Sequence, residues 1–338
     1  MSGVTFLRPL GYPPPPSIRK PTTGLVLGVG GRAGIAHHAG ALHALTSSGA
    51  IDIDDLDIII GTSAGAIVGS QLRSGVTPHT MYEIAMDPTE EGARRRGDDF
   101  FAPAWDSAMT LFQRSMGSSW VLGRSLLRFP LPVLPRQLRS LFPGGLMQLS
   151  AHADLDAHLP REWPDKHLWL VSVDIHTGRR VVLRKGGPVG ANLQQAALAS
   201  AAVPGIYQPI RVNGRTLVDG GVHSNTNLDL LLGKNLDHVT VIAPLGLSAL
   251  SPVPPPLAAV RQFVHTNLSR TVDALRAEGT TVAVLEPSAD LARIHGVNTL
   301  RVGASAEIAE AAYAETIDRL SDLVREIDLP SLPAEQAS

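Results

Sequence analysis

Ser63 lies in a glycine-flanked segment that suits nucleophilic chemistry. The run Gly61-Thr62-Ser63-Ala64-Gly65 follows an apolar, β-branched stretch at 58–60 and precedes a segment rich in Ala, Gly and Val. Strand, sharp turn and helix form a nucleophile elbow, in which small neighbours let the turn lift the hydroxyl clear of the sheet. The G-x-S-x-G pattern also arises by chance, and Ser63 would then only cap a helix. The hypothesis therefore needs partners elsewhere in the chain.

A second glycine-rich turn, Gly28-Val29-Gly30-Gly31-Arg32-Ala33-Gly34, follows an apolar run and opens a helical pattern. Consecutive glycines at such a turn can direct several backbone N–H groups at one anion, either a phosphate or the oxyanion of acyl transfer. Gly28, Gly30 and Ala33 also satisfy the dinucleotide fingerprint, so a dinucleotide-binding protein is an alternative. That alternative lacks its acidic residue after the next strand, because the four nearby aspartates precede the run at 58–60.

The third candidate is Asp219-Gly220-Gly221, which follows the strand-like Thr216-Leu217-Val218. Two glycines after an acid let the chain turn away at once, so the carboxylate stays at the carboxyl edge of a sheet, where α/β active sites gather. A simple Asp-Gly turn is the alternative. To act as a base for a serine, this carboxylate needs partial burial to raise its pKa from an ordinary value of about 3.9.

Three histidines near the glycine-rich turn, His37, His38 and His43, raise the question of a metal site. They have no acidic partner at matching spacing and stand among small residues, so we expect packing rather than metal binding. The chain has no cysteine, and its net charge of −2 gives no general attraction to nucleic acid. We expect Asn225 and Asn227 to shape a turn and cap the next helix.

Taken together, the motifs resemble the patatin-like phospholipase family of bacterial type. The resemblance covers about 24–230 and rests on Leu27-Gly28-Val29-Gly30-Gly31-Arg32-Ala33-Gly34, Gly61-Thr62-Ser63-Ala64-Gly65, Ala199-Ser200-Ala201-Ala202-Val203-Pro204-Gly205 and Asp219-Gly220-Gly221. It implies a Ser63–Asp219 catalytic dyad and an oxyanion hole made by the backbone N–H groups of Gly30, Gly31 and Arg32. The supporting motif residues are Gly28, Gly34, Gly61, Gly65, Gly220 and Gly221. Val29 stands where the family usually has glycine. The family's basic residue usually stands directly before the last glycine of the turn, where this chain has Ala33, with Arg32 one position earlier.

The resemblance implies a serine acyl hydrolase that cleaves an ester of a phospholipid, lysophospholipid or neutral lipid, with no metal or nucleotide cofactor. A small-ester esterase or thioesterase with the same dyad is one alternative, and a lipid-binding member without turnover is another. A Ser-His-Asp triad would use His223 or His265. We favour the dyad, because His223 follows the acid by only four residues and His265 lies inside a long helical pattern.

These motifs need a fold that places strand ends side by side. Short β-branched runs alternate with helical patterns along the chain. The runs lie at 25–27, 58–60, 168–173, 181–183, 217–218, 239–243 and 282–285, and the helical patterns at 34–48, 64–74, 191–201, 256–278 and 304–326. This alternation predicts an α/β fold, a three-layer α/β/α sandwich with a mainly parallel central sheet. We expect a Pro-rich lead at 1–23, one domain at 24–329 and a tail at 330–338.

A segment at about 100–153 breaks the alternation and is the predicted lid or insert. Between Ser107 and Ala153 there is no Asp or Glu, whereas five arginines are present. Cations on an apolar stretch suit peripheral contact with a membrane, and a packed insert is the alternative. No apolar run is long enough to span a bilayer, and the N-terminus lacks a signal-peptide pattern. We therefore expect a soluble, cytoplasmic protein, and the sequence leaves open peripheral contact with a membrane from one side.

Overall fold

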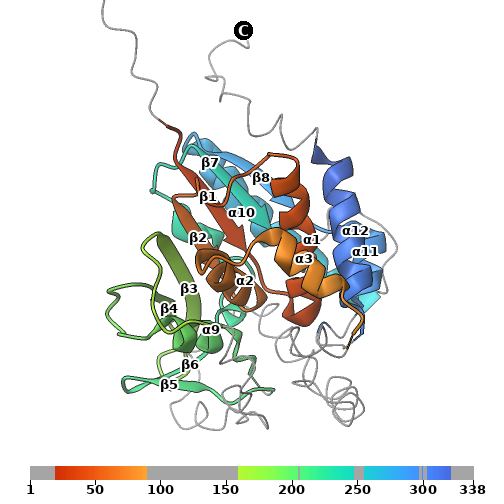
Figure 1. The fold of residues 1–338 in the computed structure, drawn as a ribbon. Coiled ribbons are helices and arrows are strands. Elements are labelled where there is room, and N and C mark those ends of the chain that lie inside the picture. Colours follow the sequence, from red (N-terminus) through yellow and green to blue (C-terminus); the bar gives the residue numbers. More distant parts are fainter. Residues whose placement is uncertain are drawn as a thin grey trace, which may run out of the picture.

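The computed structural model describes residues 20–89, 159–204, 206–246, 255–296, 299 and 303–320, without the side chains of 255–260. The predicted insert at 100–153 and the tail at 330–338 lie outside the described residues, as does most of the Pro-rich lead. Within the described residues, eight strands form one sheet. Helices cover both faces of this sheet (Figure 1).

The sheet is mainly parallel, as the sequence predicted, with an antiparallel end. Its strands are β1 (Thr23–Leu27), β2 (Ile58–Gly61), β3 (His167–Asp174), β4 (Arg180–Leu183), β5 (Ile210–Val212), β6 (Arg215–Asp219), β7 (His238–Ile242) and β8 (Thr281–Leu285). The strand order is β5-β6-β3-β2-β1-β7-β8, and β4 also pairs with β3. The pairs from β3 to β8 along this order are parallel, whereas β4 and β6 run antiparallel to β3 and β5 antiparallel to β6.

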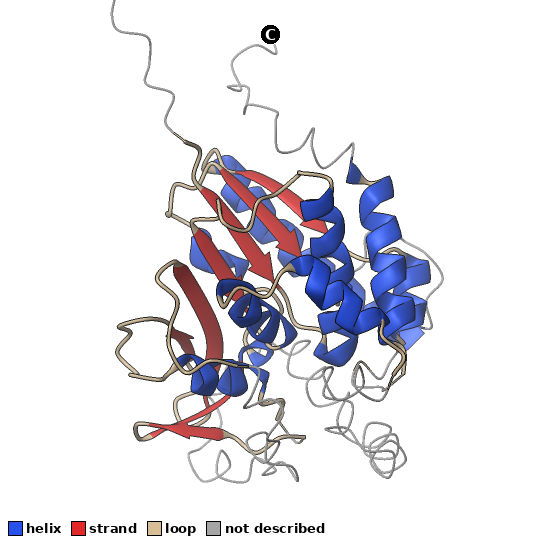
Figure 2. Cartoon of the chain, viewed as in Figure 1, coloured by secondary structure: helices blue, strands red, loops and turns tan. Residues whose placement is uncertain are grey.

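The described helices include all five that the sequence patterns indicated. They are α1 (Gly31–Ser47), α2 (Ala64–Arg73), α3 (Pro78–Met86), α9 (Leu193–Ala201), α10 (Pro255–Ala277), α11 (Ala289–His295) and α12 (Ser305–Asp318), with short 3₁₀ helices η5 (Gly220–Val222) and η6 (Leu228–Leu231). Figure 2 separates them from the strands by colour. In the part of the chain that the structure describes, no helix combines the length and apolar character needed to cross a bilayer.

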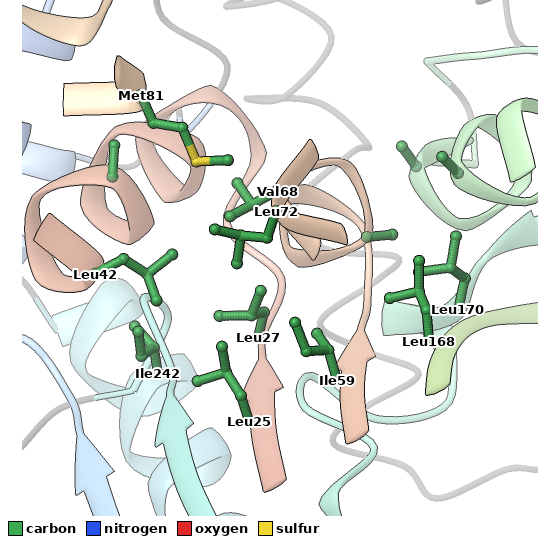
Figure 3. Close-up of a cluster of buried hydrophobic side chains, with 14 of the residues drawn as sticks. Leu25, Leu27, Leu42, Ile59, Val68, Leu72, Met81, Leu168, Leu170 and Ile242 are labelled. Carbon is green, nitrogen blue, oxygen red and sulfur yellow. The ribbon is translucent and has the colours of Figure 1, made fainter. Parts of the chain in front are cut away.

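Alternating side chains of the central strands build a core on each face of the sheet. Leu25 and Leu27 of β1 pack with Ile59 of β2 against α1, α2 and α3 (Figure 3). Val26, which lies between the two leucines, packs into the opposite core with Leu268 of α10. Burying each such side chain contributes about 1.5–3 kcal/mol. The three-layer arrangement follows, because a parallel sheet with two apolar faces must be covered on both.

The register along β3 brings the ends of β2 and β6 together. Gly61, the last residue of β2, lies opposite Leu170, and Asp219, the last residue of β6, lies opposite Ser172. Because β2 is parallel and β6 antiparallel to β3, the two strands end within two residues of each other along β3. The chain that follows β2 and the chain that follows β6 therefore begin at one point of the sheet.

Candidate active site

Ser63 occupies a strained turn between β2 and α2. Its backbone angles are φ 55° and ψ −116°, a region that a residue with a side chain rarely adopts. The N–H of Ser63 donates to Oγ of Ser200 at 3.1 Å, and the Ser200 hydroxyl donates to the carbonyl of Val171 at 2.6 Å. A buried serine from α9 thus holds the turn against β3.

The glycines around Ser63 are required by close packing. A Cβ atom on Gly65 would lie 2.1 Å from the carbonyl oxygen of Leu27, and one on Gly61 would lie 2.5 Å from the carbonyl oxygen of Gly65. Real Cβ atoms do not approach other heavy atoms so closely, so larger residues would push α2 away from β1. The tight turn after β2 depends on both glycines.

The carboxylate of Asp219 is in direct contact with Ser63. It accepts a hydrogen bond from the Ser63 side chain and another from the N–H of Gly221, the latter at 2.7 Å. Burial raises the pKa of Asp219 from 3.8 to about 6, and the two hydrogen bonds only partly oppose this shift. The arrangement therefore joins a serine hydroxyl to a carboxylate that can exchange a proton close to neutral pH.

The Asp-Gly-Gly turn packs against its surroundings without room for side chains. A Cβ atom on Gly220 would lie 2.2 Å from the carbonyl oxygen of Val171, and one on Gly221 would lie 2.8 Å from Cγ1 of Val29. The N–H of Asp219 donates to the carbonyl of Ala202 at 2.9 Å. Asp219 is thereby fixed between β3, the end of α9 and the glycine-rich turn.

The glycine-rich turn leads directly from β1 into α1. The N–H groups of Gly28 and Val29 donate to main-chain carbonyls at 2.9 Å each. Within the described residues, the structure gives no acceptor to the N–H groups of Gly30 and Gly31, which stand at the start of α1. A Cβ atom on Gly34 would lie 3.2 Å from Cβ of Ala64, so the first turn of α1 touches the elbow. Open donors at a helix N-terminus favour negative charge.

The structure brings the three sequence motifs to one place. The glycine-rich turn, the Ser63 elbow and Asp219 all lie at the carboxyl edge of the parallel strands, joined by the contacts above. The residues predicted for the site and gathered here are Gly28, Gly30, Gly31, Arg32, Gly34, Gly61, Ser63, Gly65, Asp219, Gly220 and Gly221. Arg32 belongs to the first turn of α1, and its side chain is buried.

The histidines of the alternative triad have other environments. Nδ1 of His265 lies 2.6 Å from Oε2 of Glu286, and His223 is exposed at the end of η5. The hydrogen bonds to the Asp219 carboxylate come from Ser63 and Gly221 among the described residues.

Two polar residues that hold the site were not assigned to it from the sequence. Ser200 belongs to the run Ala199–Gly205 that resembles the family, but nothing in the sequence shows that it holds the elbow. Asn227 stands at the N-cap position of η6, as the sequence predicts, but its side chain makes no capping hydrogen bond there. Instead its Nδ2 donates to Oγ1 of Thr62 at 3.1 Å, and its Oδ1 accepts from Arg180 at 3.2 Å.

The three histidines of α1 each face a different neighbour. His38 contacts the carbonyl of Gly28 through Nε2 at 2.9 Å, and the ring of His37 stacks edge-on to His295 with centroids 5.2 Å apart. His43 lies against Tyr82 at a centroid distance of 4.9 Å. Among the described residues, no group of three or more His, Cys, Asp or Glu is arranged to hold a metal ion.

Comparison with known proteins identifies the family of this chain. Residues 25–232, more than half of the chain, match the family model described as patatin-like phospholipase. The chain belongs to the patatin-like phospholipase family. As a patatin-like chain, it carries the elbow, the glycine-rich turn and the Asp-Gly-Gly turn inside the matched region.

Two relatives of this patatin-like chain come from Mycobacterium tuberculosis. The uncharacterized NTE family protein Rv2565 is 25% identical over 328 residues, which cover 89% of this chain and 47% of that protein. The uncharacterized NTE family protein Rv1063c is 27% identical over 236 residues, covering 69% of this chain and 51% of that protein. The chain thus spans about half the length of the curated relatives it matches.

Solved structures of two bacterial proteins are similar to this patatin-like chain at low identity. VipD from Legionella pneumophila aligns with a TM-score of 0.44 and 15% identity over 90% of this chain and 67% of VipD. ExoU of the Pseudomonas aeruginosa type III secretion system, in its complex with SpcU, aligns with a TM-score of 0.42 and 19% identity over 91% of this chain and 52% of ExoU.

Proposed function

We propose that this chain is a serine acyl hydrolase that cleaves carboxylic esters of lipids, in the manner of a phospholipase A. Ser63 is the nucleophile, Asp219 is its base, and the backbone N–H groups of Gly30, Gly31 and Arg32 stabilise the oxyanion. The observation that carries the proposal is the hydrogen bond from the strained Ser63 to the buried carboxylate of Asp219. Membership of the patatin-like phospholipase family supports a lipid ester as substrate.

The first half of the reaction forms an acyl-enzyme. Asp219 accepts the hydroxyl proton of Ser63 while Oγ attacks the ester carbonyl carbon, and the carbonyl π electrons move onto oxygen. The amides of the glycine-rich turn hold the resulting oxyanion; one such donor commonly contributes about 3–4 kcal/mol. The tetrahedral intermediate then expels the alcohol, which takes the proton from Asp219. The fatty acyl group stays on Ser63.

The second half repeats these steps with water. Asp219 takes a proton from a water molecule, which attacks the acyl-enzyme carbonyl. The second tetrahedral intermediate collapses with return of the proton to Oγ of Ser63, and the fatty acid leaves. A base with a pKa of about 6 suits both halves, since it is mostly ionised at pH 7 and can still hold the proton transiently.

Peripheral contact with a lipid surface is part of the proposal. It rests on the sequence at about 100–153, where arginines accompany apolar residues and no Asp or Glu occurs from Ser107 to Ala153. This segment lies outside the described residues. A dispersed, water-soluble ester therefore serves as the substrate that separates chemistry at Ser63 from binding at a membrane.

The test is a fatty-acid release assay over esters of graded acyl length. Ser63→Ala and Asp219→Asn should each lower kcat by at least about a thousandfold, because each removes a partner of the nucleophilic step. Ser70→Ala is the matched control: Ser70 is buried in α2, but its hydroxyl donates to the carbonyl of Ala66. Full turnover by Ser63→Ala, or loss of turnover on histidine modification but not in Asp219→Asn, would contradict the proposal.

A further inference from the structure

Two groups contact the carbonyl oxygen of Gly28, the first residue of the glycine-rich turn. It faces Nε2 of His38 at 2.9 Å and accepts a second hydrogen bond from the N–H of Gly65 at 3.2 Å. The two groups belong to α1 and α2, the helices that begin at the site. The peptide after Gly28 sets the direction in which the chain reaches Gly30 and Gly31. A contact that restrains this peptide therefore also restrains the orientation of the N–H groups of Gly30 and Gly31.

His38 is a neutral side chain whose described polar contact is this carbonyl. It is 0% exposed, and burial lowers its pKa to about 4. A carbonyl oxygen only accepts, so Nε2 carries the proton and donates to Gly28. In the described part of the chain, Nδ1 of His38 has no hydrogen-bond partner. An apolar side chain would fill this space without burying a lone nitrogen, so the bond to Gly28 is what the histidine adds.

We infer that His38 is a positioning residue that holds the glycine-rich turn in the shape needed for oxyanion binding. The inference rests on the proposed function and adds a residue to it that acts without touching substrate. With the Gly28 carbonyl held, the N–H groups of Gly30 and Gly31 keep one direction before the reaction begins. Without His38, the Gly28–Val29 peptide keeps its hydrogen bonds to Gly65 and Asn225 but loses the one from the imidazole. The donors that follow are then ordered less firmly before the reaction, which weakens preorganised stabilisation of the oxyanion.

His37 provides a matched control one residue away. It is 3% exposed and belongs to the same helix, so its replacement also removes a buried imidazole. Its ring lies edge-on to His295 and, at a centroid distance of 6.4 Å, to His38, and among the described residues no hydrogen bond joins it to the glycine-rich turn; burial likewise lowers its pKa. His37→Leu and His38→Leu therefore change packing similarly, whereas only the second removes the donor to Gly28.

The kinetic experiment compares wild type, His38→Leu, His38→Gln and His37→Leu on a water-soluble short-chain ester. We expect His38→Leu to lower kcat about tenfold and leave KM within about twofold, since one neutral hydrogen bond is lost away from the substrate. His38→Gln should recover most of kcat, because its amide nitrogen reaches about as far as Nε2. His37→Leu should keep the wild-type kcat. Thermal unfolding of each variant shows that the comparison is made between folded proteins.

A second measurement does not depend on turnover. Amide hydrogen exchange in the peptide that spans 28–34 should be about tenfold faster in His38→Leu than in wild type or His37→Leu. Should His38→Leu fail to fold, His38→Asn, which is too short to reach Gly28, replaces it in both experiments. Equal losses of kcat in His37→Leu and His38→Leu, with unchanged exchange at 28–34, would overturn the inference. If wild type cleaves no ester, the proposed function fails, and the exchange result still decides the role of His38.

Discussion

The buried carboxylate of Asp219 predicts a specific acid limb in the pH dependence of activity. Only the ionised form can accept the proton of Ser63, and burial raises the pKa of Asp219 from 3.8 to about 6. For a single ionisation, about half of the molecules carry the base at pH 6 and about a tenth at pH 5. An aspartate with its ordinary pKa would remain almost fully ionised at both values. The logarithm of kcat/KM should therefore fall with unit slope below pH 6.

The assay is hydrolysis of a water-soluble short-chain ester between pH 4.5 and pH 8, with circular dichroism at each pH to show that the fold persists. The expected profile is a plateau above about pH 7 and a midpoint near pH 6 in kcat/KM, which reports the free enzyme. Asp174→Asn is the control, because Asp174 is a buried carboxylate that pairs with Arg215. It should leave the midpoint unchanged. A flat profile down to pH 4.5 in folded protein would refute the assignment of a buried Asp219 as base.

Three further predictions concern stability. Asp219→Asn should raise the free energy of unfolding by about 3 kcal/mol at pH 8 and by almost nothing at pH 3.5. The reason is that the raised pKa of Asp219 makes the wild-type protein lose stability as pH rises through about 6. Urea unfolding in which the variant gains no stability over wild type as pH rises would contradict this. Gly65→Ala should cost about 3 kcal/mol in the same assay, because its Cβ would meet a carbonyl oxygen at 2.1 Å; near-wild-type stability would show that the elbow can yield. Arg261→Met should cost about 3 kcal/mol, because the buried guanidinium donates to the carbonyls of Pro244 and Gly246, whereas exposed Arg270→Met should cost little.

Much of the fold could be predicted because strands and helices have local signatures. All seven predicted strands overlap strands of the sheet, but β5 was not predicted, since it is only three residues long. Its signal was present in the Asn213-Gly214 pair that links it to β6, a strong hairpin signature. The helix α3 was also not predicted, although Thr77 caps it and Pro78 is its first residue, a common helix start.

Some residues of the candidate site could be predicted from their neighbours in the sequence, whereas others depend on contacts between distant segments. Ser63 and Asp219 could be proposed from their neighbours, because an elbow and an Asp-Gly-Gly turn are local patterns. The residues that hold them could not, because Ser200 bonds to Ser63 across 137 positions and Asn227 bonds to Thr62 across 165. These contacts arise from the register of β3 with β2 and β6, which no single segment of the sequence encodes.

The most direct measurement of the central claim is covalent labelling with a fluorophosphonate, followed by mapping of the labelled peptide. Such probes react with serines activated by a neighbouring base and held beside oxyanion donors. Our account predicts one labelled site, at Ser63, which is lost in Ser63→Ala and kept in Ser70→Ala. Absence of labelling in folded wild-type protein, or labelling that persists at another serine in Ser63→Ala, would contradict the account.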